Sequence, residues 1–342
     1  MNIKKPNIYD VAALAEVSHQ TVSRVLNNQP NIRPATRERV EAAMATLGYQ
    51  PNPAARSLGT GKSNMIGLLV ADTVLYGPAG MLNAMERQAR KAGYYAITVA
   101  IKSDSPESWA EGIQHLSKMH IEGLATIALS SDVLQMAATM LPSVTLIAID
   151  ADDEATDFQT VGINNFDGGY IATKHLIELG HKRILHITGP ATSSEANSRL
   201  RGYENAMAEA RLEPSVVQGD WSSDTGYRLG IELDLDSAAP TAIFTANDHL
   251  ALGLIKALSG RGVSVPENIS LVGFDDLPES PYFNPPLTTV RQDFTQLGEL
   301  AMQLLLSNLA GAKRKKTATI KPQLVVRESA IRISSNRKSS KQ

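Results

Sequence analysis

Apolar residues near the start of the chain recur at helical spacing in three short blocks. The residues expected on one face of the first block, "NIYDVAALAEV", are Ile8, Val11, Ala12, Leu14 and Ala15. Those expected in the second block, "SHQTVSRVLNN", are Val22, Val25 and Leu26. Asn7 and Ser18 are the expected N-caps of these two helices. A third helix is predicted from Pro34 to Leu47, with Gly48 as its C-cap. The pattern predicts a small three-helix domain over residues 1–50.

From Met65 onward, short apolar runs alternate with amphipathic helical segments. The predicted strands are "MIGLLVAD", "YYAITVAI", "GLATIAL", "VTLIAID", "RILHITG", "TAIFTAND" and "ISLVGFDD". The predicted helices between them include "AGMLNAMERQARKAG", "GGYIATKHLIELG", "NSRLRGYENAMAEARL" and "HLALGLIKALSGRG". Strands that are apolar throughout indicate parallel sheets covered on both faces. We therefore expect an α/β body of two lobes, each a parallel doubly wound sheet.

Composition narrows the class of protein. The chain has 342 residues, 43% of them hydrophobic, and no cysteine, which excludes disulfides, thiol nucleophiles and Cys-ligated zinc. No apolar run approaches the ~18 residues of a membrane span. The N-terminus is charged and lacks the apolar segment of a secretory signal. These features predict a cytoplasmic protein.

Charge is distributed unevenly along the chain. Residues 1–62 carry eight Lys or Arg against four acids, and residues from Gly311 onward carry ten against one, although the whole chain is at −2. The segment between them is therefore strongly acidic. A basic N-terminal domain on an acidic body indicates that the N-terminal domain approaches a polyanion. Ordinary solvated helices would also carry charge, so the charge pattern alone does not show that the N-terminal domain binds a polyanion.

The first two predicted helices have the form of a helix–turn–helix. Such a motif places its second helix in the DNA major groove. His19, Gln20 and Arg24 share the outward face of that helix, and each can hydrogen-bond a base edge. The residues suited to contact phosphates are Ser18, Thr21, Ser23, Asn27 and Asn31. Asn7 and Tyr9 complete the candidate DNA-binding set. The alternative is a solvated helix of a three-helix bundle.

Three stretches together resemble one protein family. "YDVAALAEVSHQTVSRVLN", "TRERVEAAMATLGYQPNPAARSL" and the α/β body resemble the lactose/galactose-repressor family of bacterial transcription regulators, from about Tyr9 to Arg332. The resemblance implies a DNA-binding head, a hinge at 51–63 and a bilobed, periplasmic-binding-protein-like core at 64–333. Its N-lobe would comprise about 64–163 and 293–321, its C-lobe about 164–292 and 322–333, followed by a disordered tail at 334–342.

The head departs from the family pattern at three positions. Glu16 stands where the family usually has glycine in the turn, at a cost of roughly 1 kcal/mol if that residue is left-handed. His19 replaces the tyrosine of a close family member, which predicts a different operator base at that point. Arg33 is a poorer helix cap than serine.

The resemblance also assigns the hinge. In relatives this segment forms a short helix on operator DNA and inserts a leucine into the minor groove, a known way to kink DNA. Leu58 takes that position here, with Asn52 and Ala55 near the backbone and groove floor. The alternative for Leu58 is a buried linker anchor.

Candidate effector-binding residues cluster at the ends of predicted strands and in adjoining loops. They are Asp150, Arg199, Trp221, Asn247, Asp275 and Gln292. Sheets of this class bind ligands beyond the carboxyl ends of their strands. Carboxylates, Arg and Asn match sugar hydroxyls, which both donate and accept, and Trp221 offers an apolar face to a pyranose ring. Asp248 in the same stretch is equally well explained as a helix cap.

The resemblance adds an apolar wall to the effector site, formed by Leu75, Pro78 and Met81. Together the residues predict a small sugar effector, and a galactoside best. Ile127 replaces a polar contact of one relative, which leaves the identity of the sugar open. A purine corepressor would need paired aromatics, which make up only 5% of the chain, and a sugar phosphate would need more cationic residues than Arg199.

The overall prediction is a repressor that binds a pseudo-palindromic operator as a homodimer, without a leucine heptad tail for tetramers. A sugar-binding transport protein would share the bilobed body but would need an export signal. An enzyme is not expected, because "VADTVLYGPAG" lacks both GxGxxG and GxxxxGK[ST]. His115 and His120 are five residues apart and are read as surface residues. No cofactor, catalytic residue or metal ligand is predicted.

Overall fold

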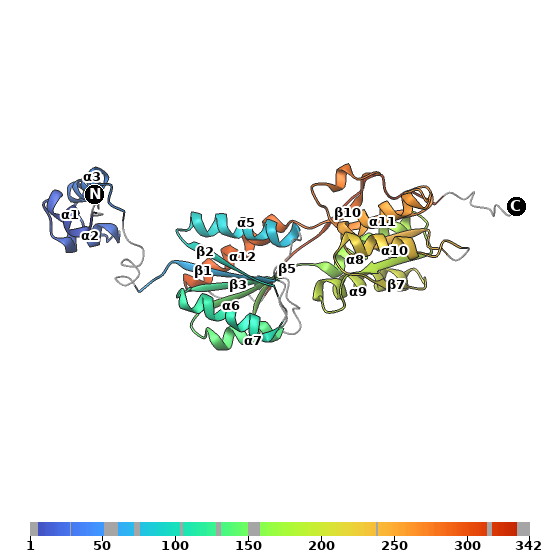
Figure 1. Cartoon of the computed structure of the whole chain (residues 1–342), viewed down its shortest axis with the longest axis horizontal. Coiled ribbons are helices and arrows are strands. Elements are labelled where there is room, and N and C mark those ends of the chain that lie inside the picture. The colour runs from blue at the N-terminus through green and yellow to red at the C-terminus, as the bar shows by residue number, and fades with distance from the viewer. Residues whose placement is uncertain are drawn as a thin grey trace. The chain divides into compact units, whose positions relative to one another are not determined.

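The computed structural model describes residues 6–27, 29–50, 61–71, 76–102, 105–127, 131–149, 158–236, 239–312 and 317–333. They form two compact units. One contains the described residues up to Met65 together with His120–Glu122, and the other contains the remaining described residues (Figure 1). No helix in these ranges is long and apolar enough to cross a membrane.

The N-terminal domain consists of three helices. They are α1 (Ile8–Leu14), α2 (His19–Leu26) and α3 (Pro34–Leu47). The α1 helix begins with a capping box, in which the Asn7 side chain accepts from the backbone of Tyr9 and Asp10, and the Asp10 carboxylate accepts from the Asn7 N–H. Val11, Val22 and Val40 are fully buried between the helices.

One predicted core residue of this domain is wrong. Leu14 is 49% exposed, whereas Val11 and Ala12 of the same helix and Ala15, its C-cap, are buried. At about 3.6 residues per turn, Leu14 lies at the margin of the stripe that Val11, Ala12 and Ala15 form, so its side chain lies beyond the face that α2 and α3 cover. Gly48 is left-handed at φ 61°, as its C-cap role requires, and Arg33 makes no side-chain capping bond to α3.

The first sheet has the strand order β11–β5–β4–β3–β1–β2. Its strands are β1 (Met65–Ala71), β2 (Tyr95–Ile101), β3 (Gly123–Ile127), β4 (Thr145–Ile149), β5 (Gln159–Ile163) and β11 (Thr317–Ile320). The pairings of β1 with β3, β3 with β4, β4 with β5 and β5 with β11 are parallel. Helices α5 (Tyr76–Lys91) and α12 (Phe294–Leu309) pack on one face, and α6 (Pro106–Lys118) and α7 (Ser131–Met140) lie on the other (Figure 1).

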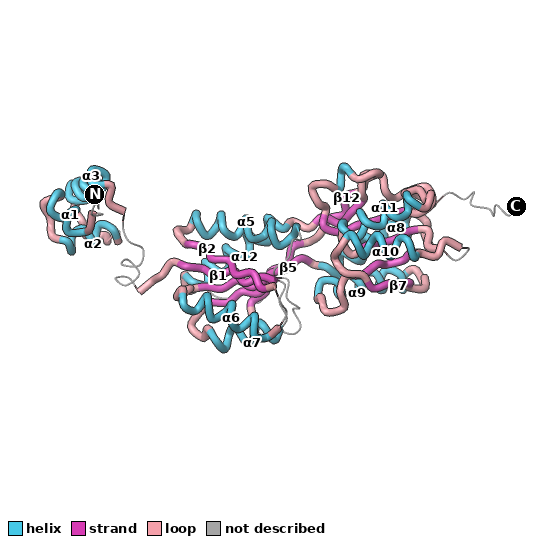
Figure 2. The backbone as a smooth tube through the Cα atoms, viewed as in Figure 1, coloured by secondary structure: helices cyan, strands magenta, loops and turns pink. Residues whose placement is uncertain are grey.

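The second sheet has the order β12–β10–β9–β8–β6–β7. Its strands are β6 (Ile184–Thr188), β7 (Ser215–Gln218), β8 (Ala242–Thr245), β9 (Ser270–Asp275), β10 (Thr288–Arg291) and β12 (Gln323–Val325). The strands of both sheets are magenta in Figure 2. Within the second sheet only the β10–β12 pairing is antiparallel. Helices α8 (Asn165–Glu178) and α9 (Ser194–Glu209) cover one face, and α10 (Ser223–Glu232) and α11 (Asp248–Gly260) the other.

The chain passes between the two sheets three times. It leaves β5 for α8, leaves β10 for α12, and leaves β11 for β12. The predicted α/β class with two doubly wound sheets is confirmed. The sequence prediction omitted β5, β7, β10, β11 and β12, which are short and include polar or exposed residues, so they lack the continuous apolar pattern of the longer central strands.

Candidate functional site

The N-terminal end of α2 presents a polar surface. Ser18 caps this helix by accepting from the Thr21 N–H at 3.2 Å, and the hydroxyls of Ser18 and Thr21 lie 3.0 Å apart. His19, Gln20 and Arg24 are exposed, as a reading face requires. The Tyr9 and His19 rings lie 5.2 Å apart, so α1 contributes an aromatic to the same surface.

The other candidate DNA-binding residues differ in accessibility. Asn31 is exposed, and Ser23 is half-buried. Asn27 is the C-cap residue of α2, and its Oδ1 atom is buried without a hydrogen-bond partner among the described residues. Asn52, Ala55 and Leu58 lie outside the described residues, and so does the predicted tail at 334–342.

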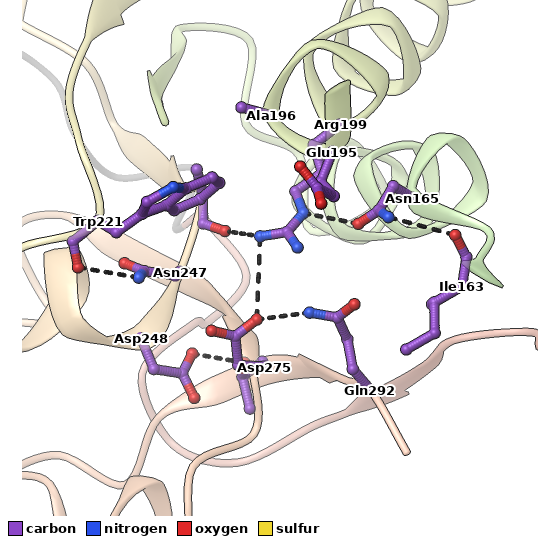
Figure 3. A network of polar contacts seen from close by, with 12 residues as sticks. Ile163, Asn165, Glu195, Ala196, Arg199, Trp221, Asn247, Asp248, Asp275 and Gln292 are labelled. Atoms are coloured by element: carbon purple, nitrogen blue, oxygen red, sulfur yellow. Dashed lines mark hydrogen bonds and ion pairs between the residues drawn. The ribbon is translucent and has the colours of Figure 1, made fainter. Parts of the chain in front are cut away.

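A group of polar side chains beside the second sheet is centred on an ion pair between Arg199 and Asp275. Arg199 lies on α9 and is only 5% exposed, and its Nη1 atom is 3.8 Å from Asp275 Oδ1 (Figure 3). The same guanidinium donates to the Asn165 side chain at 2.8 Å and to the Ala246 carbonyl. It also lies over the Phe274 ring, 3.8 Å from its centre. These contacts hold the guanidinium in one orientation.

Asp275 ends β9 with its backbone at φ 111°, a conformation rare for a residue with a side chain. Gln292, directly after β10, donates from Nε2 to Asp275 Oδ1 at 2.6 Å. Burial raises the pKa of the Asp275 carboxyl to about 6, while Arg199 and Gln292 act in the opposite direction. Non-glycine residues with such backbone angles concentrate at binding sites, because the surrounding structure must hold them there.

Asn247 and Asp248 follow β8 and have separate roles. Asn247, and not Asp248, is the N-cap of α11, and it accepts from the Leu250 N–H at 2.9 Å. Its Nδ2 atom donates to the Trp221 carbonyl at 3.0 Å, which ties the Trp221 loop to this helix. The cap hypothesis for Asp248 is therefore wrong.

Asp248 is completely buried and organises the loop after β9. Its carboxylate accepts from the Ser280 and Thr289 hydroxyls, each at 2.6 Å, and from the Leu277 N–H at 3.0 Å. Burial and the nearby charge of Asp275 raise the pKa of Asp248 to about 7, against the effect of these donors. Three protein donors make it a structural anchor rather than a group open to ligand.

Trp221 is half-buried in the loop before α10, where it packs against the core on one face of the second sheet. The Arg199 guanidinium carbon lies 5.3 Å from the centre of its ring. Gly189, at the end of β6, packs so closely on the indole that a Cβ atom there would lie 2.5 Å from it. The preceding Asp220 carboxylate accepts from Ser222 and Thr225, which fixes the loop.

The structure brings together Arg199, Trp221, Asn247, Asp275 and Gln292, and we call these five residues the polar cluster. Two of the remaining predicted effector contacts lie among the described residues, on helix α5 of the first sheet. Pro78 on α5 is half-buried, and Met81 is 2% exposed within the core packed on that sheet. Leu75 and Asp150 lie outside the described residues.

Sequence reasoning missed two neighbours of the cluster, Asn165 and Phe274. Phe274 is one residue before Asp275 and reads as an ordinary strand residue, so nothing in the sequence marks it as a platform for Arg199. Asn165 follows β5, a strand that was itself not predicted, and recognising that strand would have placed Asn165 at a strand end. Across the described ranges no group of three or more His, Asp or Glu residues could hold a metal ion.

Comparison with known proteins agrees with both parts of the molecule. The model of the bacterial regulatory proteins of the lacI family matches residues 7–52, and that of a periplasmic binding protein-like domain matches residues 173–330. The HTH-type transcriptional repressor PurR of Haemophilus influenzae is 36% identical over 331 residues, which are 94% of this chain and 98% of that protein. The lactose operon repressor of Escherichia coli K12 is 32% identical over 334 residues, 96% of this chain and 92% of that repressor.

Solved structures give the same result. The lac repressor dimer bound to operator and the anti-inducer ONPF superposes with a TM-score of 0.89 at 31% identity, covering 96% of this chain and all of that one. A complex of the regulator CelR with cellobiose gives 0.71 at 29% identity, over 95% and 99% of the two chains. The relatives named as repressors are not enzymes. The chain belongs to the lacI family of bacterial regulatory proteins, as a transcriptional repressor with a helix–turn–helix DNA-binding domain and a ligand-binding core.

Proposed function

We propose that this repressor is a cytoplasmic homodimer whose affinity for a pseudo-palindromic operator is controlled by a neutral sugar, best a galactoside, bound at the polar cluster. Two N-terminal domains related by a two-fold axis would match two DNA half-sites. Each would read bases with His19, Gln20 and Arg24, while Leu58 would insert into the minor groove between half-sites.

The observation that carries the effector proposal is the Arg199–Asp275 pair beside the Trp221 ring. The pair supplies charged donors and an acceptor within a few ångströms, and Gln292 and Asn247 add amides on either side. Each hydroxyl of a sugar donates and accepts, so a mixed set of this kind can satisfy it. The indole offers an apolar surface to the C–H face of a pyranose. A hydroxyl with the wrong configuration would leave a polar group unpaired at a cost of about 1–3 kcal/mol.

A purine corepressor is the second candidate, because the most similar repressors include those named PurR. A flat base is best held between two aromatic faces. In the polar cluster the half-buried aromatic is Trp221, whereas Phe274 is fully buried and covered by Arg199. This arrangement supports a sugar over a base. A non-galactoside sugar would use the same donors and acceptors, whereas a sugar-binding transport protein would have no use for the N-terminal domain.

Tryptophan emission tests the effector proposal, because the chain has two tryptophans and Trp109 is buried in α6, at 4% exposure. The purified repressor is titrated with methyl β-D-galactopyranoside, methyl β-D-glucopyranoside and adenine. We expect a saturable change with the galactoside that is absent in Trp221→Phe. A response to adenine or the glucoside alone would contradict the galactoside proposal.

The hinge proposal has its own test. Leu58→Ser should weaken operator binding by the ligand-free repressor and leave galactoside binding unchanged. Operator affinity equal to that of the wild type would show that Leu58 is not the wedge.

A further inference from the structure

Two amide side chains flank the Arg199–Asp275 pair, and both stand where the chain crosses between the sheets. Gln292 follows β10 and precedes α12, and it donates to Asp275. Asn165 follows β5 and is the first residue of α8, and it accepts from Arg199 Nε at 2.8 Å. The charged pair is therefore connected to two of the three crossovers (Figure 3).

Asn165 does more than hold Arg199. Its side chain is 7% exposed, and its Nδ2 atom donates to the Ile163 carbonyl at 3.2 Å. That carbonyl belongs to the peptide unit that joins Ile163 to Asn164. The N–H of the same peptide unit donates to the Ile320 carbonyl, at the end of β11, at 2.9 Å. The Ile163–Asn164 peptide unit lies in the crossover from β5 to α8. Asn165 holds its carbonyl, and Ile320, where the crossover from β11 to β12 begins, holds its N–H.

We propose that Asn165 is a positioning residue that couples effector binding to the crossover peptides. This inference rests on the proposed function, in that a ligand at the polar cluster must engage Arg199. A ligand oxygen that accepts from Arg199 redistributes its donors among Asn165, Ala246 and Asp275. Any shift of the guanidinium moves the Asn165 amide, and with it the Ile163–Asn164 peptide. Residues at crossovers of this kind absorb the backbone changes of lobe movement, so the contact gives the ligand unequal affinity for two arrangements.

The two halves of the Asn165 amide can be separated by substitution. Asn165→Asp retains an acceptor for Arg199 and loses the donor to Ile163. Asn165→Ala loses both. Asn197 provides the matched control, because it lies on α9, and its Nδ2 atom donates to the Ala191 carbonyl at 2.9 Å on an exposed surface. Asn197→Asp makes the same chemical change outside the cluster.

The decisive measurement is the dissociation constant for methyl β-D-galactopyranoside, read from Trp221 emission. It is determined with and without operator-like duplex DNA. The wild-type protein selects this DNA from a random-sequence pool. The ratio of the two constants is the coupling factor. We expect a wild-type ratio of about 10 or more. In Asn165→Asp the ratio should fall toward 1, whatever the constant without DNA, and Asn197→Asp should retain the wild-type ratio. A wild-type ratio in Asn165→Asp would overturn the proposal.

A second measurement judges Asn165 without any effector. Hydrogen exchange of the Asn164 amide is compared between the ligand-free wild-type, Asn165→Asp and Asn165→Ala proteins. Both variants should exchange this amide at least about 10-fold faster, because its peptide unit has lost one of its two anchors. Unchanged exchange in both would overturn the inference. If the wild type gave no saturable galactoside response, the proposed effector would be wrong, whereas the exchange result would still decide the role of Asn165.

Discussion

At the scale of single residues, two aspartates show how surroundings assign roles: Asp248 begins α11 after strand β8, and Asp275 ends the neighbouring strand β9. Asp248 has three protein donors and is fully buried, so its oxygens are used within the fold. Asp275 receives one hydrogen bond from Gln292 and lies 3.8 Å from Arg199. A carboxylate has about four acceptor positions, so Asp275 retains capacity for ligand hydroxyls.

The raised pKa of Asp275 predicts the pH dependence of effector binding. Its pKa of about 6 lies above the ordinary value near 3.9. Below pH 6 the carboxyl takes up a proton, and its attraction to Arg199 and its ability to accept from hydroxyls weaken. Galactoside affinity should therefore fall as the pH is lowered from 7.5 to 5. In Asp275→Asn, binding should be weaker and nearly independent of pH over this range.

The raised pKa of Asp275 has the opposite effect on the stability of the fold. Between about pH 4 and 6 the folded protein holds this proton more tightly than the unfolded chain. The contribution of Asp275 to stability therefore decreases as the pH rises through that window. Each unit of pKa shift corresponds to about 1.4 kcal/mol. Urea unfolding of the wild type and Asp275→Asn at pH 4.5 and 7 measures the difference, and a wild-type curve that gains more than the variant on going to pH 7 would contradict it.

Gly189 is predicted to set the position of Trp221. A Cβ atom at residue 189 would lie 2.5 Å from the indole, so Gly189→Ala must displace the ring. We expect at least about a 10-fold loss of galactoside affinity, which is about 1.4 kcal/mol. Gly260→Ala is the matched control, since a Cβ there meets open space at the end of α11. Equal affinities in the two variants would show that Trp221 tolerates the shift.

At the scale of elements, the turn between α1 and α2 departs from the residue its conformation favours. Glu16 has φ 54°, in the left-handed region, where glycine avoids the steric cost that a side chain adds. The Ser18 cap and the buried valines on both sides therefore hold a strained residue in place. The roughly 1 kcal/mol cost of Glu16 relative to glycine was expected only if the residue is left-handed, and its backbone meets that condition.

Relieving that strain should stabilise the N-terminal domain. Glu16→Gly is expected to raise its local unfolding free energy by about 0.5–1 kcal/mol, as read by hydrogen exchange in α1 and α2. Glu38→Gly, in the middle of α3, should lower it by up to about 1 kcal/mol. If both substitutions destabilised the domain, Glu16 would be making a stabilising contact that outweighs its backbone cost.

At the scale of the whole molecule, the N-terminal domain differs in charge from the rest of the chain. The first 62 residues carry eight cationic side chains against four acids, while the chain as a whole is slightly acidic. Phosphate contacts by the N-terminal domain release counterions, so operator affinity should fall by orders of magnitude between 50 and 200 mM salt. Galactoside affinity should hardly change with salt. A flat operator response would contradict recognition by the basic domain.

The oligomeric state is predicted at the same scale. Two half-sites require two N-terminal domains, which a pair of chains related by a two-fold axis supplies. Sedimentation velocity at micromolar concentration should give a dimer of the 36.8 kDa chain. A tetramer, or a monomer that binds the selected DNA with undiminished affinity, would contradict this prediction.

The N-terminal domain and the fold class could be read from the sequence by itself. Caps, turn residues and apolar spacing act over a few residues, so Asn7, Ser18 and Gly48 were identified correctly, and the alternating apolar runs sufficed for two doubly wound sheets. Leu14 was misassigned because periodicity gives a helix face but not where the neighbouring helices stop covering it. Short or edge strands such as β5 and β7 lack the continuous apolar runs by which central strands are recognised.

The polar cluster shows what only the tertiary structure decided. Its members come from a helix, a strand end and loops nearly a hundred residues apart, and the ends of predicted strands pointed only to Asn247 and Asp275. The hydrogen-bond partners of these residues depended on strand order and on the three crossovers. These placed Asn165 against Arg199, Gln292 against Asp275, and three donors around Asp248. Hydrogen bonds and burial depend on distances between residues remote in the chain, and periodicity carries no information about them.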